Sequence, residues 1–476
     1  MKRKNSFMVK GLSPLLVMGL LLIFGEKVWA DAAAAATPVE TVTPAKPDPF
    51  SFADFTWMNG NARVKDNPLD SKYFTPEITM DVHYIYDFAH PIDHVLVGTT
   101  EGSLVNEVEV QDVGLGGDLH VDNVIGRILT QFGTDATQTV RNDASPGVGT
   151  TDLADAYRYL SEAWGGYHFD VDYGLNVEAG IFMSYIGLFS YYSPENWTYQ
   201  PSYVSSNTPW FFNGVRIQWF PEQNLKIEPW IINGWQSYGE FNQQPGLGYQ
   251  IKWAPTGDIS TVFNGYWGTD NLGAPGLNRI HSDNSLLVKY LDNPKAPIDK
   301  VAFSFTIDYG QMWGAVPAGL GMVDTNGNAV TQITPAQENF FGFMAYNRFW
   351  FDNDHQALTL GGGWMTNTGR YLVLLPDLPN GQTGGANAIN YASPYFTENP
   401  GDPFTGWDWT VTWSIMPSQY LMWQVEFNHR GSSVPYFSGP GGVTSPNGVN
   451  VGANGGYVPN LVTSEDRVNL ACELEI

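Results

Sequence analysis

The feature that most constrains this chain is a period of two in its apolar residues, sustained over long runs. The stretch RVNLACELEI, residues 467–476, alternates apolar residues with polar or small ones without a break. Runs over 175–183, 301–309, 407–415 and 421–428 alternate in the same way. Successive side chains of a β-strand point to opposite faces, so each run predicts a strand with one apolar and one polar face. Soluble β-sandwiches contain such strands too, so the alternation alone leaves that class open.

Aromatic content and connection length favour a membrane barrel over a sandwich. Aromatic residues make up 14% of the chain, with 17 Trp, and the apolar faces carry many of these rings. The runs are about 10 residues or longer, as in strands that cross a bilayer. Short connections alternate with long Gly-, Ser-, Asn- and Pro-rich ones, as in barrels with short periplasmic turns and long outer loops. The short ones are expected at 89–93, 221–224, 255–258, 352–355 and 416–419, and the long ones at 185–209, 311–337, 367–405 and 431–463.

We therefore predict an all-β fold, a transmembrane antiparallel up-and-down β-barrel. It should have about 18 strands, with about 16 as the fallback number, a size that encloses a water-filled channel. The larger count includes two weak runs at 52–63 and 94–101. Because a closed barrel has no free edge, the last strand should pair with the first. Cys472 should then face lipid, and Arg467, Asn469, Glu473 and Glu475 the channel.

The N-terminal region has the parts of a secretory signal. A basic segment precedes an apolar core over 12–24, and Val28-Trp29-Ala30 supplies small residues for cleavage. The apolar core is shorter than the roughly 20 residues of a spanning helix. We expect a signal peptide at 1–30, a flexible Ala-, Thr- and Pro-rich lead-in at 31–50 and the barrel at 51–476.

Composition and motifs argue against several functional classes. The net charge of −25 argues against nucleic acid as a partner. Cys472 is the single cysteine, which excludes an intramolecular disulfide and a Cys-based metal site. His90 and His94 lie in a predicted turn, and DTNGN at 324–328 has Ala329 where a calcium loop needs glycine. No G-x-S-x-G element or phosphate loop occurs, so we expect no enzyme, no cofactor and no metal site.

If the apolar faces contact lipid, the opposite faces line the lumen. Charged residues on those faces are candidates to form the water-contacting wall of the lumen. We expect their acidic and basic side chains largely to neutralise one another. The candidate pore-lining residues are Asp81, Glu109, Arg127, Arg158, Glu178, Arg216, Lys226, Glu228, Lys252, Asp308, Arg348 and Glu426.

Residues 178–221 resemble the outer-membrane porins of the OmpL-like β-barrel group. Members have an AGxFxxxxG strand, a Ser-, Asn- and Pro-rich loop and then a strand with an early glycine. Gly180, Gly187, Pro209 and Gly214 match this arrangement, and IEPWIINGWQSY at 227–238 continues it. The resemblance implies a porin in the outer membrane. This sequence differs from that group at Ile476, because such barrels usually end on an aromatic residue.

These observations predict an outer-membrane channel for passive diffusion of small hydrophilic solutes or ions. The loops 185–209, 311–337 and 367–405 are the candidates to fold inward as a constriction. Two alternatives stay open: a barrel hydrolase with an active site at its rim, and a non-conducting adhesin or structural barrel. The expected partners are outer-membrane lipid, the solute and the barrel-insertion machinery. A homotrimer is an option, because porins often trimerise.

Overall fold

The structure is a computed structural model. The chain divides into two units, Met1–Lys46 and Pro47–Ile476, and the described strands all belong to the second. The predicted signal peptide and most of the lead-in lie outside the described residues, so that division stays a prediction. None of the described helices is long and apolar enough to cross a membrane. The described residues are 46–140, 143–145, 151–372, 399–443 and 460–476.

Within Pro47–Ile476, 16 strands form a closed antiparallel barrel, and β12 is one extra short strand. β1 pairs with β2 on one side and with β19 on the other, from Thr79 opposite Glu475 to Asp87 opposite Arg467. The predicted pairing of last and first strands is confirmed. The wall strands are β1 (Phe74–Asp87), β2 (Val108–Val121), β3 (Val124–Thr130), β4 (Leu160–Phe169), β5 (Leu175–Met183), β6 (Phe211–Glu222), β7 (Leu225–Ile232), β8 (Gly246–Thr256), β9 (Ile259–Gly268), β10 (Leu277–Asp292), β11 (Lys300–Ala315), β13 (Asn339–Phe351), β14 (Gln356–Thr368), β15 (Thr405–Ser418), β16 (Leu421–Ser432) and β19 (Ser464–Glu475).

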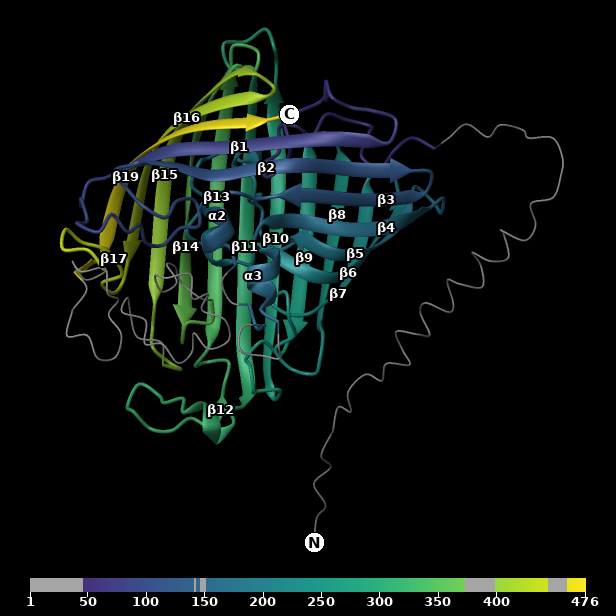
Figure 1. The fold of residues 1–476 in the computed structure, drawn as a ribbon. Coiled ribbons are helices and arrows are strands. Elements are labelled where there is room, and N and C mark those ends of the chain that lie inside the picture. Colours follow the sequence, from purple (N-terminus) through teal and green to yellow (C-terminus); the bar gives the residue numbers. More distant parts are fainter. Residues whose placement is uncertain (1–45, 141–142, 146–150, 373–398, 444–459) are drawn as a thin grey trace, which may run out of the picture. The chain divides into compact units, whose positions relative to one another are not determined.

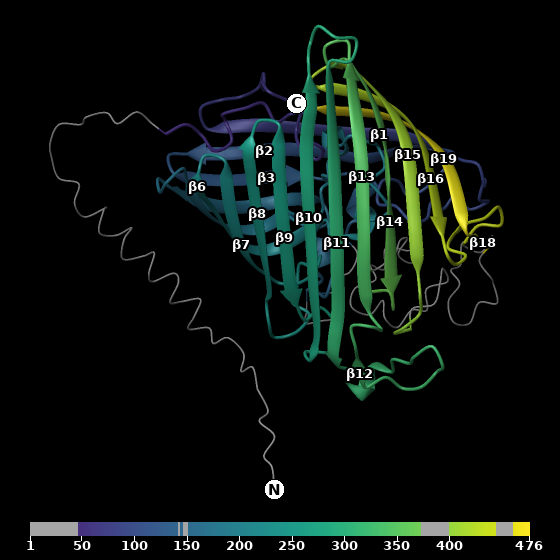
Figure 2. The same ribbon diagram turned by 180° about the vertical axis from the view of Figure 1, so that it is seen from behind.

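The remaining elements are short and lie in the connections. In Figures 1 and 2, β1 to β5 cross the view while β10 to β15 run along it, as expected for strands that tilt around a barrel. The short elements are β12 (Gln332–Ile333), β17 (Phe437–Ser438), β18 (Leu461–Val462), α2 (Asp135–Gln138), α3 (Leu153–Tyr157) and 3-10 turns at Ser193–Glu195, Ser205–Asn207 and Ala318–Leu320.

The preferred count of 18 strands was wrong, and the fallback count of 16 is confirmed. The runs 52–63 and 94–101 are turns and bends, apart from one isolated bridge between Val95 and Leu104. Several of their apolar side chains, among them Trp57 and Leu96, are buried, although Phe52 is exposed. A short alternating run therefore does not indicate a wall strand when the space inside the barrel is itself packed with protein.

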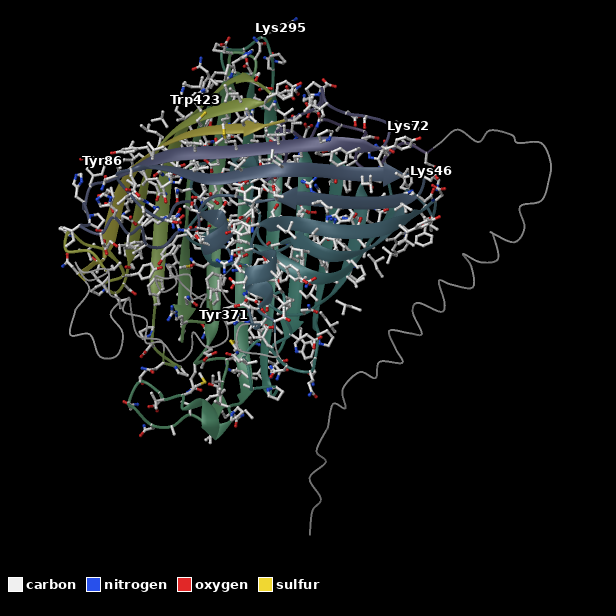
Figure 3. All side chains as sticks on the ribbon, in the orientation of Figure 1. Lys46, Lys72, Tyr86, Lys295, Tyr371 and Trp423 are labelled. Carbon is white, nitrogen blue, oxygen red and sulfur yellow. The ribbon has the colours of Figure 1, made fainter. Side chains whose placement is uncertain are left out.

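Connections of two lengths separate the two ends of the barrel. At the short-turn end, the connections after β2, β6, β8, β13 and β15 have two to four residues, such as 223–224 and 257–258. At the long-loop end they include 88–107, 184–210 and 316–338. Figure 1 places β12 at the long-loop end, and Figure 3 places Lys295, from the turn between β10 and β11, at the opposite end. The predicted short turn at 89–93 was wrong, because these residues begin the long connection 88–107.

The two faces of the strands differ as the sequence predicts. On β19, Glu465, Arg467, Asn469 and Glu473 are buried inside the barrel, while Cys472 on the other face is partly exposed. Across the wall, exposed large apolar side chains such as Trp409, Trp423 and Val425 point outward. Figure 3 shows Trp423 on the outside of the barrel, at β16. An apolar outer belt with aromatic residues fits a surface that lies in lipid.

Candidate permeation pathway

The connection between β5 and β6, residues 184–210, folds into the barrel. From Tyr191 to Phe212 every residue is buried except Glu195, which is partly exposed. A buried loop must find hydrogen-bond partners for its backbone groups, because water cannot supply them. We call this segment the inner loop, and the charged wall side chains supply many of its partners.

Two buried wall carboxylates accept hydrogen bonds from the inner loop. Glu426 on β16 accepts from the backbone N–H of Tyr199 at 2.9 Å and of Gln200 at 3.1 Å. Asp408 on β15 accepts from the N–H of Tyr203 at 3.0 Å and from the hydroxyl of Ser202 at 2.9 Å. Hydrogen bonds to a charged acceptor are stronger than neutral ones. These contacts hold the loop against β15 and β16.

Wall arginines donate to carbonyl groups of the same loop. Arg348 on β13 donates from Nη1 to the carbonyl oxygen of Trp197 at 2.6 Å, and the Thr359 hydroxyl donates to the same oxygen at 2.9 Å. Arg430 on β16 donates from Nη2 to the carbonyl oxygen of Pro201 at 2.8 Å. The inner loop is thus bound through both its N–H and its C=O groups to the wall from β13 to β16.

The wall at β1 and β2 completes the attachment. The Ser193 hydroxyl donates to Asp81 at 2.8 Å. The Tyr199 hydroxyl contacts Nδ1 of His83 at 2.6 Å, and Nε2 of His83 lies 3.0 Å from a carboxylate oxygen of Glu109. Together with β13 to β16, and with β19 between β16 and β1, these strands form what we call the anchored side of the barrel.

The opposite side, β3 to β8, retains partly exposed inward side chains and is called the open side. Arg127 on β3 forms ion pairs with Glu77 at 2.6 Å, Asp118 at 3.0 Å and Glu162 at 2.7 Å, and its side chain keeps 13% exposure. By contrast, Arg348 and Arg467 on the anchored side are 2% and 0% exposed. These charged side chains of the open side are therefore less completely covered than those of the anchored side.

Further ion pairs follow along the open side. Arg216 on β6 pairs with Glu178 on β5 and lies over the ring of Phe182, 4.4 Å from its centroid. Lys226 pairs with Glu228 on β7 at 2.8 Å. Lys252 on β8 points inward next to this row and has no ion pair or hydrogen bond among the described residues; it lies 5.3 Å from the centroid of the Phe50 ring.

Residues 50–63, which precede the first strand, occupy the short-turn end. The N–H of Phe50 donates to the carbonyl of Gln223 at 2.7 Å, and Nε1 of Trp57 donates to that of Gly257 at 3.1 Å. This segment also contacts the inner loop: the N–H of Trp197 donates to Oδ1 of Asn59 at 2.7 Å, and Nε1 of Trp197 donates to the carbonyl of Trp57 at 3.0 Å. We call residues 50–63 the entry segment, since they lie at this end of the barrel.

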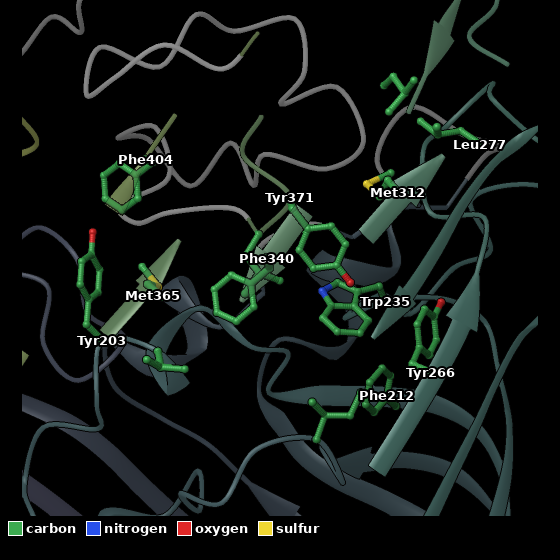
Figure 4. Close-up of a cluster of buried hydrophobic side chains, with 14 of the residues drawn as sticks. Tyr203, Phe212, Trp235, Tyr266, Leu277, Met312, Phe340, Met365, Tyr371 and Phe404 are labelled. Atoms are coloured by element: carbon green, nitrogen blue, oxygen red, sulfur yellow. The ribbon is translucent and has the colours of Figure 1, made fainter. Parts of the chain in front are cut away.

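A cluster of rings narrows the lumen near the long-loop end. Figure 4 shows Trp235, Tyr266, Phe340 and Tyr371 converging from separate strands and loops. Arg279 lies between two of them, 5.1 Å from the centroid of the Trp235 ring and 4.5 Å from that of the Tyr371 ring. Protein therefore occupies the lumen near both ends, with the ring cluster at one and the entry segment at the other.

A cavity of about 220 Å³ lies between the entry segment, the first residues of the inner loop and the wall strands β8 to β10. Met58 and Asn59 line it from the entry segment, Leu188 from the inner loop, and Lys252 and Ser260 from the wall. It adjoins the open side through Lys252.

The predicted pore-lining residues fall into distinct groups. All of them except Arg158 lie on barrel strands with their side chains on the inner face. Arg158 instead lies in the connection 131–159, directly after α3, and pairs with Asp155. Whether these residues contact a solute stays a prediction. The anchoring group is Asp81, Glu109, Arg348 and Glu426, the open-side group is Arg127, Glu178, Arg216, Lys226, Glu228 and Lys252, and Asp308 lies buried opposite Asp283 in the pairing of β10 and β11.

Among the loops predicted to fold inward, only the first does so within the described residues. The connection 316–338 is largely exposed from Pro317 to Ala329 and projects from the long-loop end. Most of the third loop, 367–405, lies outside the described residues. The sequence did not predict that the entry segment lies within the lumen. Its Phe and Trp residues directly after the lead-in could have indicated a segment that packs inside the barrel.

Strand closure, the apolar outer belt and the polar, partly filled lumen define a transmembrane β-barrel of the porin class. The family model described as "Putative beta-barrel porin-2, OmpL-like" matches residues 76–454. The chain therefore belongs to this family, and it is an outer-membrane channel of the porin type. The resemblance inferred from residues 178–221 is confirmed.

Several solved outer-membrane proteins match this chain at low sequence identity. The outer membrane channel DcaP of Acinetobacter baumannii matches with a TM-score of 0.45 and 12% identity, over 85% of this chain and 96% of that one. The anion-selective porin from Comamonas acidovorans matches with 0.44 and 8%, over 85% and 99%. OprB of Pseudomonas putida matches with 0.44 and 10%, over 85% and 94%. No curated protein matches the chain in sequence.

Proposed function

We propose that small hydrophilic solutes and ions cross this channel passively along the open side, β3 to β8, with the inner loop as a fixed constriction. The observation that carries the proposal is the difference in exposure between the two sides. Inward side chains of the anchored side are almost fully buried beneath the loop, whereas Arg127, Arg216 and Lys226 keep 13%, 16% and 14% exposure. Water and solute need free volume, and the partly exposed charged side chains of the open side support a passage there.

The charged wall residues then divide their roles. Those of the open side present paired acids and bases to the solute, which produces a local field without a large net charge. Those of the anchored side, such as Arg348 and Glu426, act by holding the loop. We therefore propose that the predicted pore-lining residues on β3 to β8 contact the solute. Those of the anchored side position the inner loop.

Permeation in this proposal involves no chemical step, and the proposal assigns no catalytic role to the barrel. The aromatic outer belt, which includes Trp409 and Trp423, supports contact with lipid. Recognition by the insertion machinery and assembly as a homotrimer stay predictions. The large apolar outer surface is compatible with either lipid or a second barrel as its neighbour.

Cysteine accessibility tests where the solute passes. In a Cys472→Ala background, Gln218→Cys on the open side is compared with Gln424→Cys on the anchored side. Both positions are glutamines with inward side chains, Gln218 partly exposed and Gln424 1% exposed. Treatment with a charged methanethiosulfonate during bilayer recording should reduce the current through the Gln218→Cys channel and leave the other unchanged. Reaction at Gln424→Cys alone would place the passage on the wrong side.

A further inference from the structure

Among the residues that line the cavity beside Lys252, three have a buried side-chain donor without a hydrogen-bond partner among the described residues. We propose that this cavity is a binding subsite for a small solute with a carboxylate head and an apolar body. The inference rests on the proposed permeation function, since the subsite lies next to the open side. A subsite of this kind makes the channel select small solutes that carry a carboxylate and an apolar body.

The first observation is the side chain of Lys252. The inward-facing lysines around it are paired: Lys226 lies 2.8 Å from Glu228, and Lys289 lies 3.1 Å from Asp258 and 2.7 Å from Asp292. The ammonium of Lys252 has no carboxylate partner among the described residues. An unpaired cation at a cavity wall attracts an anionic ligand, and its attraction is stronger where the walls have a low dielectric constant.

The second observation is independent of that charge. Three residues of the lining each have a buried side-chain atom that finds no hydrogen-bond partner within the described part of the chain: Nδ2 of Asn59, Nε1 of Trp210 and Oγ of Ser260. These residues are 3%, 3% and 0% exposed. Leaving a buried polar group unpaired typically costs about 1–3 kcal/mol, so native structures rarely do so without a ligand or water. A ligand that accepts hydrogen bonds would satisfy these donors.

The orientation of the neighbouring groups supports this reading of Asn59 and Trp210. Oδ1 of Asn59 already accepts from the N–H of Trp197, so its remaining free group is the amide donor. An indole N–H can only donate. The site therefore requires an acceptor-rich ligand, and a carboxylate offers two oxygen atoms with no donor of its own.

The charge of the lining contrasts with that of the chain. The sequence has 48 Asp and Glu against 23 Lys and Arg, yet none of the described residues that line this cavity carries a carboxylate. Glu228, which interacts electrostatically with Lys252, is already paired with Lys226 and accepts a hydrogen bond from Gln218 at 2.7 Å. A local excess of positive charge in an acidic protein favours an anion at this position.

The rest of the lining sets the shape of the ligand. Met58, Leu188, Phe189, Val262 and Leu287 supply apolar surface. At about 220 Å³ the cavity is smaller than the roughly 300–1,000 Å³ of sites for drug-sized molecules. A short organic acid such as benzoate or propionate would place its tail on this surface and its carboxylate at Lys252. Inorganic phosphate has no such tail and should bind less well.

The test uses the full-length channel in a planar bilayer with chloride as the conducting ion. Benzoate should interrupt the chloride current reversibly, and neutral benzamide should not. Lys252→Met should weaken the block by benzoate about tenfold or more, because it removes the charge-assisted contact. Trp210→Phe and Ser260→Ala should each weaken it severalfold while keeping the fold. Lys300→Met is the matched control, since that lysine also points inward but pairs with Asp354 at 2.9 Å.

The outcomes separate this inference from the proposed function. A conducting channel in which benzoate and benzamide act alike, or in which none of the three cavity variants weakens the block, would overturn the subsite. Stronger block by phosphate than by benzoate would overturn the assigned ligand class. If no current is seen, calorimetry with benzoate on the folded protein decides: binding that Trp210→Phe weakens supports the subsite while the permeation proposal fails.

Discussion

Arg348 of the barrel wall donates a 2.6 Å hydrogen bond to the backbone carbonyl of Trp197 in the inner loop. The two residues are 151 positions apart in the sequence, and both are buried. The bond shows how this barrel fixes a loop within its lumen: charged wall side chains replace the water that loop backbone groups would otherwise bind.

Replacing Arg348 by Met should destabilise the loop without opening the barrel. The thioether can fill similar space but cannot donate to the Trp197 carbonyl, which keeps only the Thr359 hydroxyl. We expect a loss of about 1–3 kcal/mol in the free energy of unfolding. Urea unfolding in detergent, followed by Trp fluorescence, measures it. A Lys300→Met variant, which breaks a pair with the exposed Asp354, should change stability by under about 1 kcal/mol. Equal effects of the two changes would contradict the anchoring role.

Glu426 offers a graded version of the same experiment. Its carboxylate accepts from two loop N–H groups, from the Thr412 hydroxyl at 2.6 Å and from the Asn469 amide at 2.9 Å. Glu426→Gln retains one acceptor oxygen, whereas Glu426→Ala leaves these donors unpaired. Stability should therefore decrease in the order wild type, Gln, Ala, with about 2–5 kcal/mol lost in the Ala variant. An Ala variant as stable as the Gln variant would show that these bonds contribute little.

Trp57 of the entry segment should limit the current. Its ring is 2% exposed and it joins the inner loop to the 257–258 turn through two hydrogen bonds. Trp57→Ala removes the ring and one of those bonds, so single-channel conductance should rise. Phe52→Ala, at a ring that is 40% exposed, is the control and should leave conductance near the wild-type value. An unchanged or lower conductance for Trp57→Ala would argue against a constriction at this end.

Cys472 should contact lipid. It points outward between the inward residues Ala471 and Glu473. A fluorophore attached to Cys472 in unfolded protein and then refolded into bilayers should be quenched by nitroxide-labelled lipid. The same fluorophore at Ala471→Cys in a Cys472→Ala background should not be quenched. Stronger quenching at position 471 would reverse the assignment of faces on β19.

Glu338, in the connection before β13, should make stability depend on pH. Burial raises the pKa of its carboxyl from 4.5 to about 8, and Arg279 opposes this shift. Since the folded state then binds the proton more tightly, the stabilisation is present at low pH and is lost as the pH rises from about 4.5 to about 8. Glu338→Gln should flatten this part of the stability curve. An identical pH dependence in both proteins would exclude Glu338 as its source.

The sequence predicted the wall well and the lumen poorly, for a physical reason. In β15 and β19 each residue is sorted by lipid on one side and polar groups on the other, so a period of two is enough to assign its face. The entry segment has no such sorting, because Trp57 packs inside a protein-filled lumen, and its run at 52–63 was mistaken for a strand. The contact of Tyr199 with Glu426 joins residues 227 positions apart, which no local pattern encodes. Whether a lumen carboxylate anchors a loop or contacts a solute is set by such contacts.

The most direct test of the account is the ionic current through purified, folded protein in a planar bilayer. We expect discrete current steps, with conductance that rises when Trp57 is replaced by Ala and falls when Gln218→Cys is modified. A folded barrel that inserts into the bilayer and passes no current, in the wild type and in Trp57→Ala alike, would contradict the claim that this protein is a channel with its passage along β3 to β8.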